Sequence, residues 1–474
     1  MLEKLHSLWS WVLSFFEWFL ALLVSNALVV IGFVLAVIII LRVFREQRQP
    51  SSIFAWSFLI ILIPPLGIPL YVLLGGRKLK KKIEAKGLLT EGAEDVNHSI
   101  NIQDQFYSAG NRIKFLTDGQ IAFHTYCRLI KEAEKEIHIL TYILGNDETG
   151  NAMLDLLTER AREGLRVRLL VDALGSFYKP RKKIKALKEA GGEVFTFMPA
   201  LPFQTHGWAN LRNHRKIAVF DNKKSILGGR NLDTRFMGES PDPKRFYDFG
   251  AVYEGPIVDC LNGIFLSDWS FASKQSLHEI RDLVPAQENP IGNSQLTGIV
   301  SGPDVVGDML YERLVNIIQE FDEELVIVTP YFVPDEVLLT SLTVKARRGK
   351  RITLILPEKS NWKVVDFVRS HYLRDLHAAG VNIQFFTEGM LHAKFMISDR
   401  QLLLHGSANF DIRSLFVNFE IGIVHTTLED LEAVFVWLEW LLERCRPFGT
   451  DKELHPGGSR RVIEDAARLF APLL

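Results

Sequence analysis

The sequence is poor in cysteine. Its 474 residues include three cysteines, Cys127, Cys260 and Cys445, which are far apart and occur in no Cys-x-x-Cys or His/Cys ligand spacing. This distribution excludes the common zinc motifs. Because an unpaired cysteine behaves mostly as a small buried hydrophobe, we expect three reduced core residues with no metal-binding or catalytic role.

The sequence also lacks an excess of charge of either sign. Its 55 Lys and Arg residues face 56 Asp and Glu residues, which leaves a formal net charge of −1. Proteins that bind nucleic acid usually carry a broad basic field. We therefore expect no nucleic-acid partner for this chain, and any basic patch must be local.

Two long apolar runs set residues 1–90 apart from the rest of the chain. The runs cover about 20–41 and about 53–74, and each has about the 20 residues needed to cross a bilayer. We expect an N-terminal helical membrane anchor. Pro64, Pro65 and Pro69 interrupt the second run, so a full span and a kinked or re-entrant hairpin both remain open.

Positive charges flank the second apolar run on both sides. Arg42, Arg45 and Arg48 precede it, and a stronger cluster at 77–82 follows it. Because positive residues favour the cytoplasm, the stronger cluster predicts that the part of the chain after the anchor is cytoplasmic, whether the second run spans or re-enters.

The remainder of the chain alternates strand-like and helical stretches, and it does so twice. Residues 136–142 match 324–331, and residues 164–171 match 349–356, each pair with a helical stretch between them. A length of 474 residues leaves room for two globular units. We therefore predict an α/β fold made of two similar halves, 112–292 and 293–474, related by a pseudo-two-fold axis.

The strongest signal is a motif that recurs at a constant offset. His214, Lys216 and Asp221 form the pattern His-x-Lys-x4-Asp, and 178 residues later the pattern returns as His392, Lys394 and Asp399. Residues i and i+2 share a face of a strand, so we expect each imidazole to project together with its ammonium. One copy is weak evidence for a site, but two copies within a duplicated frame favour a single active site.

Small residues, an amide and a carboxylate follow each motif. Gly229 and Asn231 in the first half correspond to Ser407 and Asn409 in the second, where close backbone approach and amide donors suit phosphoryl oxygens. Further on, Asp248 corresponds to Glu420 at an offset of 172, which places six extra residues in the first half, in the loop 238–244. We expect Asp248 and Glu420 each to orient an imidazole as a triad acid does.

With these residues the chain resembles the phospholipase D superfamily, whose signature is a pair of such motifs. Within it the chain is most similar to bacterial cardiolipin synthases, at residues 329–335, 389–394, 406–415 and 418–420 and at the N-terminal segment 52–75. The resemblance implies an α/β sandwich in each half, a place in the bacterial inner (cytoplasmic) membrane, and phospholipid substrates. It implies no metal and no other cofactor.

The resemblance also implies a mechanism of phosphatidyl transfer between two phosphatidylglycerol molecules through a phosphatidyl-histidine. On family habit, His214 attacks phosphorus and His392 exchanges protons, while Lys216, Lys394, Asn231 and Asn409 hold the phosphoryl oxygens. Asp221 and Asp399 brace the site rather than react. Water, phosphatidylethanolamine or a free alcohol as acceptor remains an alternative, as do a nuclease and an inactive membrane scaffold. Nothing in the sequence indicates an oligomeric state.

Two further segments carry open alternatives. The aromatic stretch 195–208 could guide acyl chains or form a buried loop over the core. The tail 460–474 is expected to form an amphipathic helix with Val462, Ala466, Leu469 and Phe470 near one face, which would pack on the domain or rest on the membrane.

Overall fold

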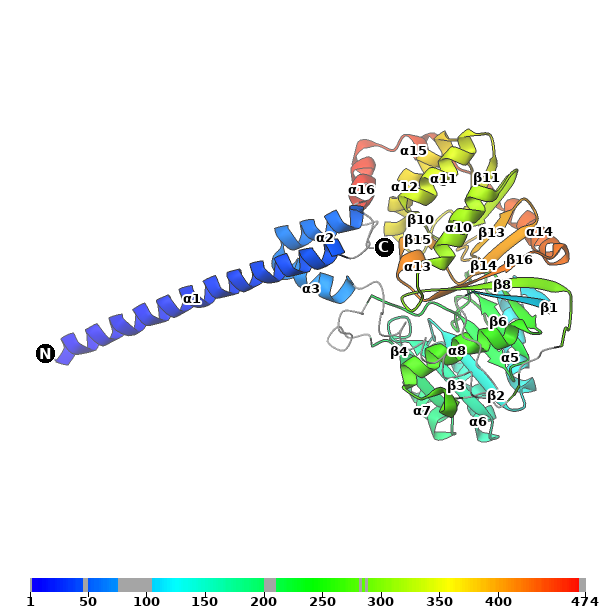
Figure 1. Ribbon diagram of the computed structural model, residues 1–474, viewed down its shortest axis with the longest axis horizontal. Coiled ribbons are helices and arrows are strands. Elements are labelled where there is room, and N and C mark those ends of the chain that lie inside the picture. Colours follow the sequence, from blue (N-terminus) through cyan, green and yellow to red (C-terminus); the bar gives the residue numbers. More distant parts are fainter. Residues whose placement is uncertain are drawn as a thin grey trace. The chain divides into compact units, whose positions relative to one another are not determined.

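The computed structural model describes residues 2–45, 50–75, 105–199, 210–280, 284–285 and 289–468. These residues form two compact units, one containing the N-terminal helices and one containing all the strands (Figure 1). The basic cluster at 77–82, most of the aromatic stretch 195–208, and Leu469 and Phe470 lie outside the described residues.

The first unit contains helices α1 (Leu2–Arg45), α2 (Pro50–Leu62) and α3 (Pro64–Leu74). The helix pattern breaks at Ile63, immediately before two prolines that cannot donate backbone hydrogen bonds. Helix α3 folds back on α2: the rings of Trp56 and Tyr71 pack edge to face with centroids 5.4 Å apart. Gly67 allows this close approach, since a Cβ there would lie 2.6 Å from the Leu59 carbonyl oxygen.

The second predicted span is therefore a helical hairpin and not one continuous helix. Its helices have 13 and 11 residues, about 20 Å or less each, whereas a bilayer core is about 30 Å thick. Within the described part of the chain, no helix combines the length and the apolar character that a membrane crossing requires. The predicted crossing at 20–41 is thus not confirmed either, although α1 covers these residues.

The second unit begins with the strands and helices of the first half. They are β1 (Gln105–Leu116), α5 (Gly119–Glu132), β2 (Glu136–Thr141), α6 (Glu148–Arg162), β3 (Arg166–Asp172), α7 (Arg181–Glu189), β4 (Glu193–Phe197), β5 (Ile217–Phe220), β6 (Lys224–Gly228), β7 (Gly250–Glu254), α8 (Ile257–Ser273) and α9 (Leu277–Ile280). Strand β1 begins ahead of the predicted start at residue 112.

The second half repeats this order with additions at its end. Its elements are β8 (Ser294–Ser301), α10 (Met309–Glu320), β9 (Glu324–Val328), β10 (Phe332–Val333), α11 (Glu336–Arg347), β11 (Arg351–Pro357), α12 (Lys363–Ala378), β12 (Asn382–Phe386), β13 (Phe395–Ser398), β14 (Leu402–Gly406), β15 (Phe410–Asp411), α13 (Ile412–Phe416), β16 (Glu420–His425), α14 (Leu428–Leu442), β17 (Cys445–Pro447), α15 (Asp451–Leu454) and α16 (Gly458–Arg468). The predicted boundary at 292/293 directly precedes β8 and stays a prediction.

The strand order shows the duplication directly. Fifteen strands follow one another as β17-β12-β11-β9-β13-β14-β16-β8-β1-β7-β6-β5-β2-β3-β4. Outward from the antiparallel pair β1–β8, the strands of the two halves follow in matching order: β16, β14, β13, β9, β11 and β12 on one side correspond to β7, β6, β5, β2, β3 and β4 on the other. Strand β17 is an addition at one edge. The α/β fold and its two similar halves are as predicted, and Figure 1 shows the pair β1–β8 between them.

Each half has its own apolar core. In the first half, residues such as Ile139, Leu169 and Ala218 from the sheet pack against Leu129 and Leu157 from α5 and α6. The strands β2 and β3 are buried on both faces, as expected for parallel strands covered by helices. A third cluster, which includes Leu227, Tyr253, Leu296 and Ile423, joins the halves across β1 and β8.

The C-terminal helix docks through a face that the sequence did not predict. Helix α16 buries Glu464, whose carboxylate lies 2.7 Å from Arg374 of α12, and packs Ala467 against the core. Val462 and Ala466, from the predicted apolar face, are exposed. The helix therefore packs on the domain through an ion pair. The three cysteines, which all lie within the described residues, form no disulfide; Cys260 is buried, and Cys127 and Cys445 are half-buried.

Candidate functional site

The two His-x-Lys motifs lie just outside the strands to which we assigned them. His214 and Lys216 precede β5, which begins at Ile217, and His392 and Lys394 precede β13, which begins at Phe395. Both motifs lie at the end of the sheet where strands β2 and β9 finish, because Ile217 pairs with Leu140 near the end of β2 and Phe395 pairs with Val328 at the end of β9. Carboxyl ends of strands are the usual place for ligand sites in α/β folds.

The backbone at each motif pairs with the opposite half of the protein. The His214 N–H donates to the Phe419 carbonyl at 3.0 Å, and the His392 N–H donates to the Tyr247 carbonyl at 2.6 Å. Phe419 and Tyr247 are the residues immediately before Glu420 and Asp248. This exchange brings the carboxylate of each half to the histidine of the other.

The carboxylates are consequently crossed between the halves. Nδ1 of His214 lies 2.9 Å from Oε1 of Glu420, and Nδ1 of His392 lies 2.6 Å from Oδ2 of Asp248. Both carboxylates are fully buried. Because each imidazole can donate its Nδ1–H to a carboxylate, Nε2 is left as the nitrogen available for chemistry.

The residues at the Gly229 and Ser407 positions fit these two carboxylates. A Cβ on Gly229 would lie 2.2 Å from Oδ1 of Asp248, so only glycine leaves room for that carboxylate. Ser407 instead donates its hydroxyl to Oε2 of Glu420. Both positions were predicted to contact substrate, but the structure places them against the carboxylates that hold the histidines.

The two lysines lie beside the two histidines, and burial shifts their ionisation. Lys216 donates to the His214 carbonyl at 2.5 Å, and Nζ of Lys394 lies 2.7 Å from Nδ1 of His392. Burial lowers the pKa of Lys216 to about 7 and that of Lys394 to about 8, although Glu420 and Asp248 oppose this shift. A bound anion would therefore raise both lysine pKa values and stabilise the charged ammonium groups.

The imidazoles are mainly neutral at neutral pH. Burial, together with the positive charges of Lys216 and Lys394, lowers the pKa of His214 to about 4 and that of His392 to about 3. Lys394 acts on His214, and Lys216 acts on His392, in addition to each lysine's own motif. The two motifs thus form one electrostatic site, as the duplicated pattern predicted. An anionic phosphate beside the imidazoles would raise both pKa values.

Asp221 and Asp399 lie away from this chemistry. Each follows its strand at the end opposite the histidine, with a positive φ of 52° or 49°. The Asp221 carboxylate accepts the backbone N–H groups of residues 134–136, and the Asp399 carboxylate accepts those of 322–324. Both residues fasten the start of a neighbouring strand, so they support the sheet and do not touch the histidines.

The two asparagines differ in their surroundings. Oδ1 of Asn231 accepts the Ile143 N–H at 3.0 Å, which ties it to the loop after β2. Asn409 lines a pocket together with Lys394, and its Oδ1 has no hydrogen-bond partner among the described residues. An amide binds a phosphoryl oxygen through its side-chain N–H groups, so the bonded Oδ1 of Asn231 does not prevent that residue from donating, and Asn409 lines the pocket beside Lys394.

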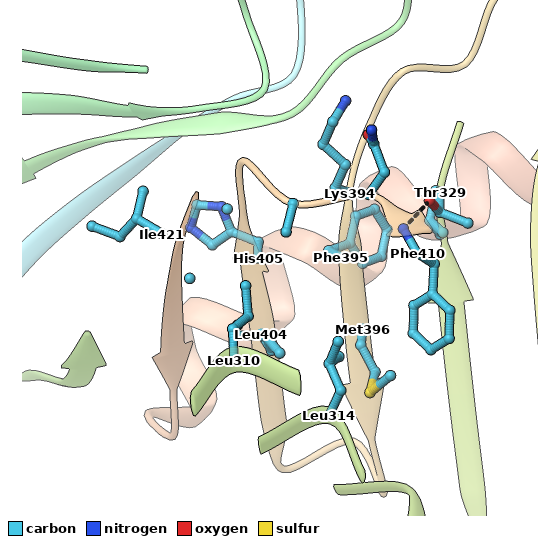
Figure 2. A pocket seen from close by; sticks show the side chains of 15 residues that line it. Leu310, Leu314, Thr329, Lys394, Phe395, Met396, Leu404, His405, Phe410 and Ile421 are labelled. Atoms are coloured by element: carbon cyan, nitrogen blue, oxygen red, sulfur yellow. Dashed lines mark hydrogen bonds between the residues drawn. The ribbon is translucent and has the colours of Figure 1, made fainter. Parts of the chain in front are cut away.

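The pocket beside Lys394 belongs to the second half alone. It is a small cavity of about 40 Å³ that is partly open to solvent, and most of its lining is apolar. Figure 2 shows Lys394 near one end and Leu314 and Met396 at the other. The first-half counterpart of Ala408, which lines it, is Arg230, a buried side chain that donates to the Leu116 and Asp248 carbonyls.

Two tyrosines next to the histidines were missed in the sequence analysis. The Tyr142 ring packs edge to face on His214 with centroids 5.0 Å apart, and Tyr331 does the same with His392 at 6.4 Å. Both tyrosines come just after the strands β2 and β9, at the ends of the matched segments 136–142 and 324–331. Their shared place in the repeat was the available signal.

These groups supply what substitution at a phosphodiester requires. One neutral imidazole can attack phosphorus, a second can exchange protons with the leaving and entering hydroxyls, and two ammonium groups can stabilise the phosphoryl oxygens. The geometry is close to symmetric, so it does not itself select the attacking histidine.

The chain is similar in sequence to proteins of one known family. The sequence matches the protein family described as "Cardiolipin synthase, PLD-like domain" over residues 126–269 and 314–441, and the family described as "Phospholipase_D-nuclease N-terminal" over residues 34–76. A cardiolipin synthase of Halalkalibacterium halodurans is 29% identical over 99% of this chain and 96% of its own length. The major cardiolipin synthase of Bacillus subtilis is 29% identical over 95% of this chain and 100% of its own.

The chain also resembles a third cardiolipin synthase in sequence and one solved structure in fold. A cardiolipin synthase of Clostridium perfringens is 31% identical over 80% of this chain and 85% of its own length. The crystal structure of phosphatidylserine synthase from Haemophilus influenzae matches 82% of this chain and 100% of its own with a TM-score of 0.59 at 15% identity, which supports the fold alone. With a family match in each half of the sheet and relatives that align over most of its length, the chain belongs to the cardiolipin synthase family of phospholipase D-like proteins.

Proposed function

We propose that this protein is a cardiolipin synthase that transfers a phosphatidyl group between two phosphatidylglycerol molecules and releases glycerol. The observation that carries the proposal is the single site in which two histidine–lysine pairs are each held by a carboxylate of the opposite half. Its relatives, which are named as cardiolipin synthases, support the same activity.

In the first step Nε2 of His214 attacks the phosphorus of one phosphatidylglycerol. A bond from nitrogen to phosphorus forms, the bond to the glycerol oxygen breaks, and His392 gives its proton to the departing alkoxide. Burial lowers the pKa of His392 to about 3. The negative charge of the bound phosphodiester raises this pKa, because it stabilises the protonated imidazole.

In the second step a hydroxyl of another phosphatidylglycerol attacks the phosphatidyl-histidine. His392 takes the proton of that hydroxyl, the new phosphodiester bond forms, and His214 leaves as a neutral imidazole. Lys216, Lys394 and the side-chain N–H groups of Asn231 and Asn409 hold the phosphoryl oxygens through both steps. Glu420 holds His214 in the tautomer that attacks, and Asp248 orients His392.

The pocket beside Lys394 suits the apolar part of a lipid. Its walls include Leu310, Leu314, Met396 and Phe410, with the ammonium of Lys394 near one end (Figure 2). Because the cavity has a volume of only about 40 Å³, we assign to it a small apolar part of one substrate, with the phosphate of that substrate toward Lys394. An apolar pocket directly behind the phosphate site favours a lipid substrate over a nucleic acid.

The first unit supports a membrane location. Its helices expose many large apolar side chains, among them Phe33, Ile38, Phe54, Phe58 and Leu66. Exposed apolar surface on this scale is typical of contact with lipid or another protein. We place α1 and the α2–α3 hairpin in the bacterial inner membrane, with the hairpin re-entrant and the catalytic part on the cytoplasmic side, as the flanking arginines and lysines favour.

The activity is tested with purified protein and headgroup-labelled phosphatidylglycerol. We expect cardiolipin and free glycerol in equal amounts, and no cardiolipin from the His392→Asn variant. Phosphatidic acid as the main product would show hydrolysis instead. A parallel reaction with added phosphatidylethanolamine identifies the acceptor, because transfer to that lipid would yield a product of different mass.

A further inference from the structure

Two loops that follow equivalent strands expose bulky apolar side chains at the edge of the sheet that carries the site. The loop after β3 exposes Leu174, Phe177 and Tyr178, and Tyr178 is 83% exposed. The loop after β11 exposes Trp362 and, at the start of α12, Val364, and Trp362 is 58% exposed. Single exposed apolar residues are common, but aromatic residues at equivalent positions of both halves are not expected by chance.

Each loop contacts a tyrosine that packs against one of the two histidines. Ser176 donates its hydroxyl to the Tyr142 carbonyl at 2.9 Å, and Tyr142 packs on His214. In the second half Tyr331 donates its hydroxyl to Asn361 at 2.6 Å, and Tyr331 packs on His392. Both loops with exposed apolar side chains therefore lie at the end of the sheet that carries the site.

Hydrogen bonds to the protein's own backbone hold both loops in place. Oδ1 of Asp172 accepts the N–H groups of Leu174 and Gly175. In the other loop the Ser360 hydroxyl and the Trp362 backbone bond each other, and Asp366 accepts the Ser360 N–H. The apolar tips are thus presented to solvent by braced turns and are not the result of a loose loop.

Cations lie next to these apolar tips in both halves. Arg181 and Lys182 are exposed directly after the first loop, and Lys359 and Lys363 are exposed on either side of Trp362. Aromatic rings with adjacent cations suit the headgroup region of a bilayer that contains anionic lipids. The same combination would not favour an apolar protein partner, because burial would desolvate the cations.

We propose that these two loops form a rim that inserts into the surface of an anionic bilayer and seats the site over its lipid substrates. The rim consists of Leu174, Phe177, Tyr178, Trp362 and Val364. The proposal rests on the proposed function, and it adds a second membrane contact that is separate from the N-terminal helices. Its consequence is that a phospholipid reaches the histidines without leaving the bilayer.

The test compares two triple variants of the full-length protein in vesicles of phosphatidylcholine and phosphatidylglycerol. The rim variant carries Phe177→Ser, Tyr178→Ser and Trp362→Ser. The matched control carries Tyr107→Ser, Leu428→Ser and Val436→Ser, which are equally exposed apolar positions on β1 and α14. Helix α14 follows β16 at the end of that strand opposite Glu420, away from the site. Thermal melting of both variants checks the fold.

We expect the rim variant to lose about tenfold or more in kcat/KM on vesicles while the control stays near wild type. On monomeric dihexanoyl phosphatidylglycerol, which needs no bilayer, all three proteins should make the product at similar rates. Equal rates of the rim variant and the control on vesicles would overturn the rim. Absence of product from monomeric and vesicle lipid alike would instead overturn the proposed function.

A second readout tests the rim even without activity. Brominated phosphatidylglycerol quenches tryptophans that enter the bilayer, and the difference between wild type and Trp362→Phe isolates the emission of Trp362. We expect that emission to be quenched in vesicles that contain the brominated lipid. Unquenched Trp362 emission would contradict insertion of the rim.

Discussion

The crossed carboxylates lead to a prediction that separates the two histidines. Asp248→Asn and Glu420→Gln each remove one buried charge and keep the side-chain shape. Because Asp248 contacts His392 and Glu420 contacts His214, we expect Asp248→Asn to fail as His392→Asn does. Glu420→Gln should fail as His214→Asn does. Support of each histidine by the carboxylate of its own half would predict the opposite pairing.

The structure sets the size of the effect. Burial alone would raise the pKa of Asp248, but Lys394 and His392 lower it to about 2. A fall from 3.8 to about 2 corresponds to about 2 kcal/mol of interaction that an amide loses. An interaction of about 2 kcal/mol alone corresponds to about 30-fold in kcat. Replacing a triad acid by its amide also favours the wrong tautomer and lowers kcat by about 10,000-fold in a serine protease, so we expect a loss here between about 30-fold and 10,000-fold.

The assay uses a phosphatidyl ester of 4-nitrophenol, which departs without a proton. With this substrate Asp248→Asn should still form the phosphatidyl-enzyme and then accumulate it, because His392 is also needed as the base of the second step. Glu420→Gln should form little adduct, because its attacking imidazole is no longer held. Intact mass after acid quench measures the adduct on each protein, and His214→Asn and His392→Asn serve as references.

The crossed arrangement would be refuted by one outcome in particular. If Asp248→Asn matches His214→Asn in adduct formation and Glu420→Gln matches His392→Asn, the carboxylates do not act on the histidines that they contact. If adduct appears on His214→Asn and not on His392→Asn, the crossing can still hold, but the two histidines exchange roles. Thermal melting of all four variants excludes loss of fold as the cause.

Three further predictions follow from single contacts in the structure. Gly229→Ala should lower kcat sharply with little change in melting temperature, since its Cβ would lie 2.2 Å from the Asp248 carboxylate; an unchanged kcat would contradict the fit. Asp399→Asn should lower the free energy of unfolding by about 2 kcal/mol in a urea titration, because three backbone N–H groups lose a charged acceptor. Its kcat should change little. A large loss of kcat without loss of stability would show that Asp399 takes part in the reaction. Finally, kcat/KM should fall as pH rises past about 7 to 8, because burial lowers the pKa of Lys216 to about 7 and of Lys394 to about 8 and the ammonium charge is lost above these values. The Lys216→Arg variant should keep a larger fraction of its own maximal activity at high pH. If the alkaline side of its pH–rate profile does not shift, a group other than Lys216 causes the loss of activity.

The duplication and the chemistry of the site were readable from the sequence. The offset of 178 residues pairs His214 with His392 and Gly229 with Ser407, and it continues through β5 and β6 to β13 and β14. These features are local: a strand is specified by its own run of apolar residues, and a motif is specified by residue types at short spacing. The proline break of the second apolar run was readable for the same reason.

Only the tertiary structure decided which groups act together. Glu420 and His214 are 206 positions apart, and their contact depends on how the backbone of one half pairs with the other at Phe419. No pattern within either half contains that information, because the two halves have equivalent motifs and carboxylates. Pairing within a half and pairing across the halves therefore look the same in the sequence.

The same reason explains two features that the sequence did not predict. Asp221 and Asp399 belong to the motif, but strands β5 and β13 separate them from the histidines. Their carboxylates therefore lie at the opposite end of the sheet. Helix α16 has an apolar face by periodicity, yet the ion pair of Glu464 with Arg374 decided which side docks. The sequence by itself determined the residues, their repetition and their local conformation; the packing of the two halves decided which of them share a site, because a distance between remote residues is a property of the packing and not of the spacing.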